Sequence, residues 1–326
     1  MTILVTGAAG FIGYHVAEAL LARGDRVLGI DSVNDYYDVT LKEARLARLA
    51  RHNAFEFLKL DLARHEEFAA ALAGRDEIKR VIHLAAQAGV RYSLDHPFAY
   101  VDANLVGHMT ILEFCRRQPG FEHLVYASSS SVYGGNTALP FAVEDRVDTP
   151  VSLYAATKRA NELMSHCYAH LYAMPQTGLR FFTVYGPWGR PDMALYIFTK
   201  AISEGRPIRV FNHGDMKRDF TYVDDVVAGV VAAIDRAPAP AAGAAPHLLY
   251  NIGNSRSEPL MRLIGLIEQA LGAKAEIRFE PMQPGDVKET YADISAIRRD
   301  LGFEPRTSID EGVPRFVAWY RDYHQK

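Results

Sequence analysis

Cysteine is scarce in this 326-residue sequence, which contains only Cys115 and Cys167. The distance between them matches neither a metal-ligand pair nor a disulfide framework. Both positions fall within helical patterns, where an unpaired cysteine behaves as a small apolar side chain. We therefore expect two buried thiols and no metal site.

Strong net charge and long apolar runs are also missing. The formal net charge of −3 lacks the basic footprint that nucleic-acid binding needs. The densest basic run, Arg45, Arg48 and Arg51, has the spacing of the solvated face of an amphipathic helix. The longest apolar run, residues 226–234, is too short for a bilayer span of about 20 residues. The first ten residues, MTILVTGAAG, lack a signal-peptide pattern. We expect a cytoplasmic protein with neither nucleic acid nor membrane as a partner.

Short β-branched runs alternate with helical patterns through the first half of the chain. The expected strands cover residues 3–7, 26–31, 55–61, 80–86 and 123–129. This alternation predicts an α/β fold with a doubly wound parallel sheet of the Rossmann type. A sixth strand is expected at 179–187, and the chain returns to the sheet around 222–252. We predict one domain over residues 1–180 and a smaller C-terminal α/β substrate-binding lobe over 181–326.

Three glycines follow the first strand and open a helix: Gly7, Gly10 and Gly13. They allow a tight turn and a close approach to pyrophosphate, which the helix N-terminus attracts. The second strand ends in Asp31, whose carboxylate would bind ribose hydroxyls and repel a 2′-phosphate. We expect NAD as the cofactor, with Phe11 and Ile12 in the same loop.

The GxxGxxG spacing resembles that of the extended short-chain dehydrogenases. The resemblance implies that Asp61 and Leu62 lie near the adenine, and that Leu84, Ala85 and Ala86 border the cofactor. Asp61 could instead cap a helix.

Tyr154 and Lys158 form a YxxxK pattern, which places both on one helix face. A phenol titrates near 10, and a nearby ammonium favours the phenolate, so Tyr154 could act as a general base. A second such pattern joins Tyr196 to Lys200. The extended family places a catalytic Ser or Thr at a strand end before the tyrosine, where this chain has Ser129. We therefore predict Ser129, Tyr154 and Lys158 as catalytic, and Tyr196 as core or pocket wall.

Five segments resemble UDP-glucuronate 4-epimerases, and the similarity extends over nearly the whole chain. The segments are residues 31–46, 85–107, 179–194, 218–225 and 283–293. Nucleotide-sugar 4,6-dehydratases have Asp-Glu where this chain has Ser130-Ser131, and UDP-glucuronate decarboxylases have Glu at Ser131. What the resemblance implies is oxidation at C4 to a 4-keto sugar, turnover of the ring and reduction on the other face, which interconverts UDP-glucuronic and UDP-galacturonic acid.

The resemblance also implies a substrate site. Hydroxyl and cationic groups should hold the sugar carboxylate: Ser128, Ser129, Ser130, Thr183 and Arg190. Arg218 would pair with the diphosphate, Asp286 would hold a ribose hydroxyl, Phe211 would lie on the uracil, and Gln87 and Arg91 would line the sugar site, with Asn104 structural or near the active site.

Five of these residues also have a structural alternative, and Arg218 could form a surface ion pair. Thr183 could bond its own backbone, and Arg190 could be a surface residue. Asp286 could form a turn, and Phe211 could be a core aromatic.

Two other functions stay open at this point. Many UDP-galactose epimerases have Asn in place of Thr183, so a UDP-glucose or UDP-N-acetylhexosamine 4-epimerase is the alternative enzyme. A non-catalytic NAD- or sugar-binding module of the same fold is the other. The family also implies a homodimer formed by the helix near residues 102–117 and the helix that carries Tyr154.

Overall fold

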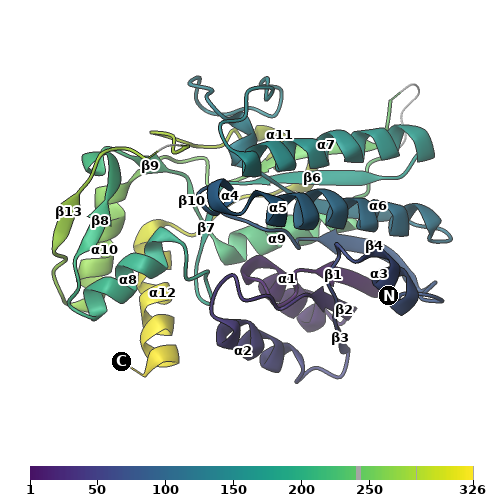
Figure 1. Cartoon of the computed structure of the whole chain (residues 1–326), viewed down its shortest axis with the longest axis horizontal. Coiled ribbons are helices and arrows are strands. Elements are labelled where there is room, and N and C mark those ends of the chain that lie inside the picture. The colour runs from purple at the N-terminus through teal and green to yellow at the C-terminus, as the bar shows by residue number, and fades with distance from the viewer. Residues whose placement is uncertain (240–243, 284, 326) are drawn as a thin grey trace.

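Seven parallel strands form the central sheet in the computed structural model, which describes residues 1–239, 244–283 and 285–325. Their order across the sheet is β11-β6-β5-β4-β1-β2-β3 (Figure 1). This confirms the doubly wound α/β fold predicted from the sequence. The strands are β1 (Thr2–Thr6), β2 (Arg26–Asp31), β3 (Phe55–Lys59), β4 (Ile78–His83), β5 (His123–Ser129), β6 (Gln176–Phe181) and β11 (His247–Ile252).

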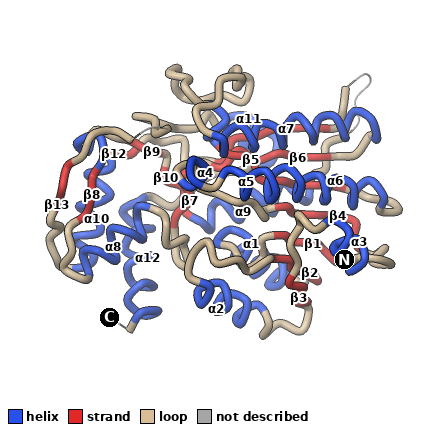
Figure 2. Tube along the Cα trace, viewed as in Figure 1, coloured by secondary structure: helices blue, strands red, loops and turns tan. Residues whose placement is uncertain are grey.

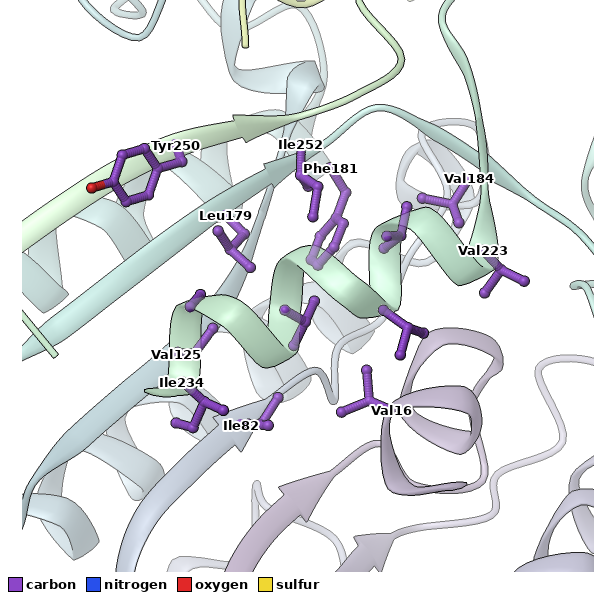
Figure 3. Close-up of a cluster of buried hydrophobic side chains, with 14 of the residues drawn as sticks. Val16, Ile82, Val125, Leu179, Phe181, Val184, Val223, Ile234, Tyr250 and Ile252 are labelled. Carbon is purple, nitrogen blue, oxygen red and sulfur yellow. The ribbon is translucent and has the colours of Figure 1, made fainter. Parts of the chain in front are cut away.

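Helices cover both faces of the sheet, and the buried strands are apolar on both sides as parallel strands require. One face is covered by α1 (Phe11–Arg23), α2 (Val39–Leu49) and α9 (Val223–Asp235). The other is covered by α3 (His65–Ala71), α6 (Gly107–Arg117) and α7 (Leu153–Tyr172). Figure 3 shows α9 packed against the sheet, with Val223 and Ile234 among side chains from several strands and from α1.

A smaller lobe lies beyond the carboxyl end of the sheet, at the left of Figure 1, and its helices and short strands can be followed in Figure 2. It has its own apolar core, separate from the two that flank the sheet. Its elements are β7 (Thr183–Tyr185), α8 (Ala194–Ser203), β8 (Ile208–Val210), β9 (Lys217–Arg218), β10 (Phe220–Tyr222), β12 (Glu258–Pro259), α10 (Leu260–Leu271), β13 (Ile277–Phe279) and α12 (Ile309–His324).

The remaining elements are short and connect these layers. They are α4 (Tyr92–Asp95), α5 (Pro97–Tyr100), a π-helix at Val101–Val106, 3₁₀ turns at Ser130–Tyr133 and Phe211–Gly214, and α11 (Ser295–Leu301). In the described part of the chain no helix is long and apolar enough to span a membrane, and no cluster of His, Cys, Asp and Glu could hold a metal.

The single strand expected at residues 179–187 is two strands. β6 ends at Phe181 beside β11, whereas β7 pairs with β10 in the smaller lobe. The backbone N–H of Phe182 still bonds to Ile252, but the next one, of Thr183, bonds to Asp219. The chain therefore leaves the sheet between these two residues and carries Thr183 toward the smaller lobe.

Two other sequence-based expectations are wrong. Arg45 is fully buried rather than solvated, because its guanidinium donates to the carbonyls of Ala9 and Trp188, at 2.8 and 2.6 Å. It therefore ties α2 to two loops, whereas Arg48 and Arg51 are exposed as expected. Cys115 is buried as expected, but Cys167 is exposed on α7.

A buried ion pair joins α7 to the sheet. Arg180 on β6 donates through Nε and Nη2 to the two carboxylate oxygens of Glu162, at 2.8 and 3.0 Å, and each side chain is 1 % exposed. Ser128 at the end of β5 donates to the same carboxylate at 2.6 Å. Burial opposes the charge on Glu162, but the bonds and charge of Arg180 outweigh it and lower the pKa of the carboxyl. This network fixes α7 against the strand ends.

We expect Glu162→Gln to destabilise the fold by about 3–5 kcal/mol, because it leaves the guanidinium of Arg180 buried without its counter-charge. Urea denaturation measures this loss. Glu311→Gln, which breaks an exposed pair with Arg315, is the control and should change stability by less than about 1 kcal/mol. Equal effects of the two substitutions would contradict the central role of Glu162.

Candidate active site

One cavity of about 1170 Å³ lies at the carboxyl ends of the sheet strands and extends into the smaller lobe. In open α/β sheets ligands bind at this edge. Residues from both parts of the chain line it. Among them are all the predicted site residues: Gly7, Gly10, Phe11, Ile12, Gly13, Asp31, Asp61, Leu62, Leu84, Ala85, Ala86, Gln87, Arg91, Ser128, Ser129, Ser130, Tyr154, Lys158, Thr183, Arg190, Phe211, Arg218 and Asp286.

The glycine loop packs its backbone directly against neighbouring backbone. Gly7 has a φ of +74°, and a Cβ there would lie 2.8 Å from the amide nitrogen of Ala85. A Cβ on Gly13 would lie 2.0 Å from the carbonyl oxygen of Gly7. Side chains are therefore excluded, and α1 begins directly beside the cavity, where its N-terminal N–H groups can meet a phosphate. This cradle fits the pyrophosphate of a dinucleotide.

Two carboxylates border the dinucleotide end of the cavity. Asp31 accepts hydrogen bonds from the backbone N–H groups of Ala9 and Val33, at 3.1 and 2.8 Å, so its position is fixed at the end of β2. Asp61 accepts from the N–H of Ala63 at 3.0 Å, whereas α3 begins four residues later. Asp61 therefore closes a turn and does not cap the helix.

Ser129 and Tyr154 meet at the centre of the cavity. Ser129 ends β5, and Tyr154 lies in the first turn of α7, where Ser152 caps the helix by accepting from Ala155 N–H at 3.1 Å. Burial raises the pKa of the Tyr154 phenol, while a hydrogen bond with Ser129 and the positive charge of Arg190 oppose the increase. The surroundings therefore contain the groups needed to stabilise a phenolate.

Lys158 lies one turn further along α7 and is 4 % exposed. Burial lowers its pKa to about 8, and the charge of Glu162 opposes this effect. Its Nζ donates to the carbonyl of Ala127 at 2.9 Å, so the ammonium is held at the end of β5 beside Ser128 and Ser129.

The carboxylate-binding candidates occupy different positions around Tyr154. Ser130 and Thr183 line the cavity from the end of β5 and from β7. The hydroxyl of Ser128 already donates to Glu162. Arg190 is not a free surface residue, since it forms a two-pronged pair with Asp192 through Nε and Nη2 at 3.0 and 2.5 Å.

The far end of the cavity collects the candidates for nucleotide binding. Arg91, which was expected to line the sugar site, instead lies with these candidates: it pairs with Asp286 at 3.0 Å, and its guanidinium lies 4.6 Å from the centre of the Phe211 ring. Arg218 donates to the carbonyls of Lys217 and Lys288, at 2.8 and 3.1 Å. Burial lowers the pKa of Arg218. The positive charge of Arg91 lowers this pKa further, whereas the negative charge of Asp286 raises it. An anion bound here would offset the repulsion between the two guanidinium groups.

Asn104 has a structural role. Its side chain accepts from the Gln87 N–H at 2.8 Å and donates to the Gln87 carbonyl and the Thr157 hydroxyl, each at 3.0 Å. It thus fixes the backbone of the loop that follows β4 to α7. Tyr196 belongs to the core of the smaller lobe and packs on Phe316, in agreement with the choice of Tyr154 over Tyr196.

Sequence reasoning missed Tyr36 and Asp192, which also line the cavity. The hydroxyl of Tyr36 donates to Asp192 at 3.0 Å. The signal was available in the segments at residues 31–46 and 179–194, which the resemblance had already set apart, but no periodicity or spacing showed that these two segments meet.

A Rossmann sheet, a glycine loop that excludes side chains and a Ser-Tyr-Lys set at the strand ends define an extended short-chain dehydrogenase. The model of the NAD dependent epimerase/dehydratase family matches residues 3–253. The chain belongs to that family.

Individual relatives cover essentially the whole chain. A probable UDP-glucuronate 4-epimerase of Rhizobium meliloti is 47% identical, over 100% of this chain and 98% of that protein. The crystal structure of UDP-glucuronic acid 4-epimerase from Bacillus cereus, in complex with UDP-glucuronic acid and NAD, is similar at a TM-score of 0.89. It is 34% identical and covers 99% of this chain and 100% of its own. UDP-glucose 4-epimerase of Thermotoga maritima, solved with UDP-glucose, is similar at a TM-score of 0.88 and 28% identity, over 99% and 100% of the two chains.

We expect Tyr154→Phe to reduce the turnover rate at least about 100-fold, because general acid–base groups contribute on this scale. NAD should stay bound, since the glycine loop and Asp31 are untouched. Product analysis and the NAD content of the purified variant test this. The matched control Tyr168→Phe removes a hydroxyl from the same helix that bonds Glu113 and should retain activity. Turnover by Tyr154→Phe at the wild-type rate would contradict the assignment.

Proposed function

We propose that the chain is a UDP-glucuronate 4-epimerase that interconverts UDP-glucuronic acid and UDP-galacturonic acid. The observation that carries this is that serine, threonine and arginine side chains line the same cavity as Tyr154, and that the charge of Arg190 acts on the Tyr154 phenol. A neutral hexose would not need Arg190 there. The similarity to the two UDP-glucuronate 4-epimerases supports the same substrate. We assign cofactor binding to the domain of residues 1–180, with the segment that returns around 222–252. Residues 181–326 bind the nucleotide sugar together with the side chains of the first domain that line the same cavity.

The mechanism needs one acid–base group. The glycine loop and Asp31 would hold NAD, which when bound would supply the acceptor of the C4 hydride and its return to the opposite face of the ring. Tyr154 takes the proton of the C4 hydroxyl as the 4-keto sugar forms and gives it back on reduction. Ser129 holds the C4 oxygen beside the phenol, and Lys158 supplies positive charge that favours the phenolate.

The substrate's charges divide between the two ends of the cavity. Arg91 and Arg218 bind the diphosphate, Asp286 a ribose hydroxyl and Phe211 the uracil, while Gln87 lines the sugar site. Ser128, Ser129, Ser130, Thr183 and Arg190 surround the carboxylate. The hydroxyl of Ser128 donates to Glu162, so Ser128 contributes by fixing the strand end and not by a direct bond to the carboxylate of the sugar. Charge-assisted bonds to both anions give the complex a defined orientation.

Proton NMR with UDP-glucuronic acid and no added cofactor tests the proposed function. We expect signals of UDP-galacturonic acid to grow until the two epimers reach equilibrium. UDP-pentose as the main product would instead indicate a decarboxylase. No conversion, with turnover of UDP-glucose or UDP-N-acetylglucosamine, would keep the fold and chemistry but favour the alternative epimerase.

We also propose that the enzyme is a homodimer formed through α6 and α7. Apolar side chains are exposed along these helices and the short helix before them. Phe98 is 78%, Leu163 55% and Met109 37% exposed. Figure 1 shows α5, α6 and α7 together on one side of the sheet. Two copies of this surface would bury these side chains in a symmetric interface.

We expect Leu163→Glu to convert a dimer into a monomer of 36.3 kDa, because each interface would then bury two carboxylates without partners. Light scattering after gel filtration measures the mass. Phe279→Glu, at an apolar side chain that is 52% exposed on β13, is the control and should leave the mass unchanged. A monomeric wild-type protein would contradict the proposal.

A further inference from the structure

The loop between β2 and α2 places Tyr36 on the cavity wall, opposite the strand ends that carry the serines. Its hydroxyl donates to Oδ2 of Asp192 at 3.0 Å, and its ring lies 4.7 Å from the ring of Tyr92. Asp192 in turn engages Nε and Nη2 of Arg190. Tyr36, Asp192 and Arg190 therefore form a chain of contacts that ends at the sugar site.

The loop that follows β4 leaves room for the Tyr36 hydroxyl. Gly89 has a φ of +102°, and a Cβ there would lie 2.7 Å from Oη of Tyr36 and 3.9 Å from Nη2 of Arg190. The absence of a side chain at residue 89 is what allows the Tyr36 hydroxyl to approach the loop, whereas the distance to Arg190 is an ordinary contact. Tyr100 also donates to the carbonyls of Ala88 and Gly89, which fixes that stretch of backbone.

The arrangement fixes the direction of the guanidinium. Two of the three guanidinium nitrogens of Arg190, Nε and Nη2, donate to Asp192. The third nitrogen, Nη1, is not engaged with that carboxylate. Arg190 and Tyr154 line the same cavity, and the positive charge of Arg190 favours the phenolate form of Tyr154. Burial disfavours the charge of the guanidinium, but Asp192 outweighs this and raises the pKa of Arg190. Arg190 is therefore a fixed cation, and the Tyr36 hydroxyl fixes the carboxylate that orients it.

We propose that Tyr36 is a positioning residue for the uronic acid carboxylate: through Asp192 it holds Arg190 in the orientation that selects a charged sugar and prevents loss of CO₂. This rests on the proposed function. The 4-keto intermediate is a β-keto acid, which decarboxylates when its C5–C6 bond aligns with the π orbitals of the C4 carbonyl. That bond then breaks, CO₂ leaves, the electron pair delocalises onto the C4 oxygen, and a proton from water adds at C5. A fixed guanidinium prevents the required rotation.

The test uses Tyr36→Phe, which keeps the ring in its tilted contact with Tyr92 and removes only the hydroxyl. Calorimetry should show a Kd for UDP-glucuronic acid raised about tenfold, as expected for a hydrogen bond to a charged group, with the Kd for UDP unchanged. NMR should show that UDP-4-ketopentose and UDP-pentose form a several-fold larger share of the products. Asp192→Asn should act in the same direction and more strongly.

Tyr250→Phe is the matched control, because the Tyr250 hydroxyl also donates to a carboxylate oxygen, of Asp300, at 3.0 Å. It lies in β11 and should change neither the Kd values nor the products. Equal increases in both Kd values for Tyr36→Phe would show general loosening and overturn the proposal, as would an unchanged product share. A wild-type enzyme that does not convert UDP-glucuronic acid would overturn the proposed function first, and this inference with it.

Discussion

The position of α7 on the sheet depends on the buried pair between Glu162 and Arg180. Two charges removed from water need close geometry and full hydrogen bonding, and here Arg180 and Ser128 supply it. Glu162 lies one turn after Lys158 and two turns after Tyr154. The pair therefore holds the helix that carries both groups against the end of the strand that carries Ser129. The alignment of the acid–base set follows from an interaction outside that set.

The sheet was predictable because each of its central strands is a short apolar run that alternates with a helical pattern. The glycine loop and the position of Asp31 at the end of β2 were predictable because each depends on neighbours in the sequence, and the prediction of Tyr154 over Tyr196 rests on neighbours in the same way. Contacts between residues far apart in the sequence could not be predicted. Arg45 has the spacing of a solvated residue, yet carbonyls of two distant loops make it buried. Tyr36 meets Asp192 only because the loop between β2 and α2 and the loop after β7 line the same cavity.

Two of the arginines that line the cavity form ion pairs with carboxylates of the same chain. Arg91 pairs with Asp286 and Arg190 with Asp192. A cationic group that has a partner before substrate arrives does not have to be desolvated and oriented from water at binding, which reduces the free energy lost on association. The same pairing weakens the attraction to any single anion. A substrate with charge at both ends therefore fits this cavity better than one with a neutral sugar.

Epimerisation makes opposing demands on the sugar end. The ring must present both faces to the same reacting position, so the surrounding groups must accept two poses. Serine and threonine hydroxyls can donate in either pose because they rotate. A guanidinium cannot adapt in this way, since its donors lie in a rigid fork. If Arg190 stays fixed by Asp192 while the hydroxyls rotate, the carboxylate keeps one constant partner as the ring turns, and the C5–C6 bond is held where the β-keto acid is stable.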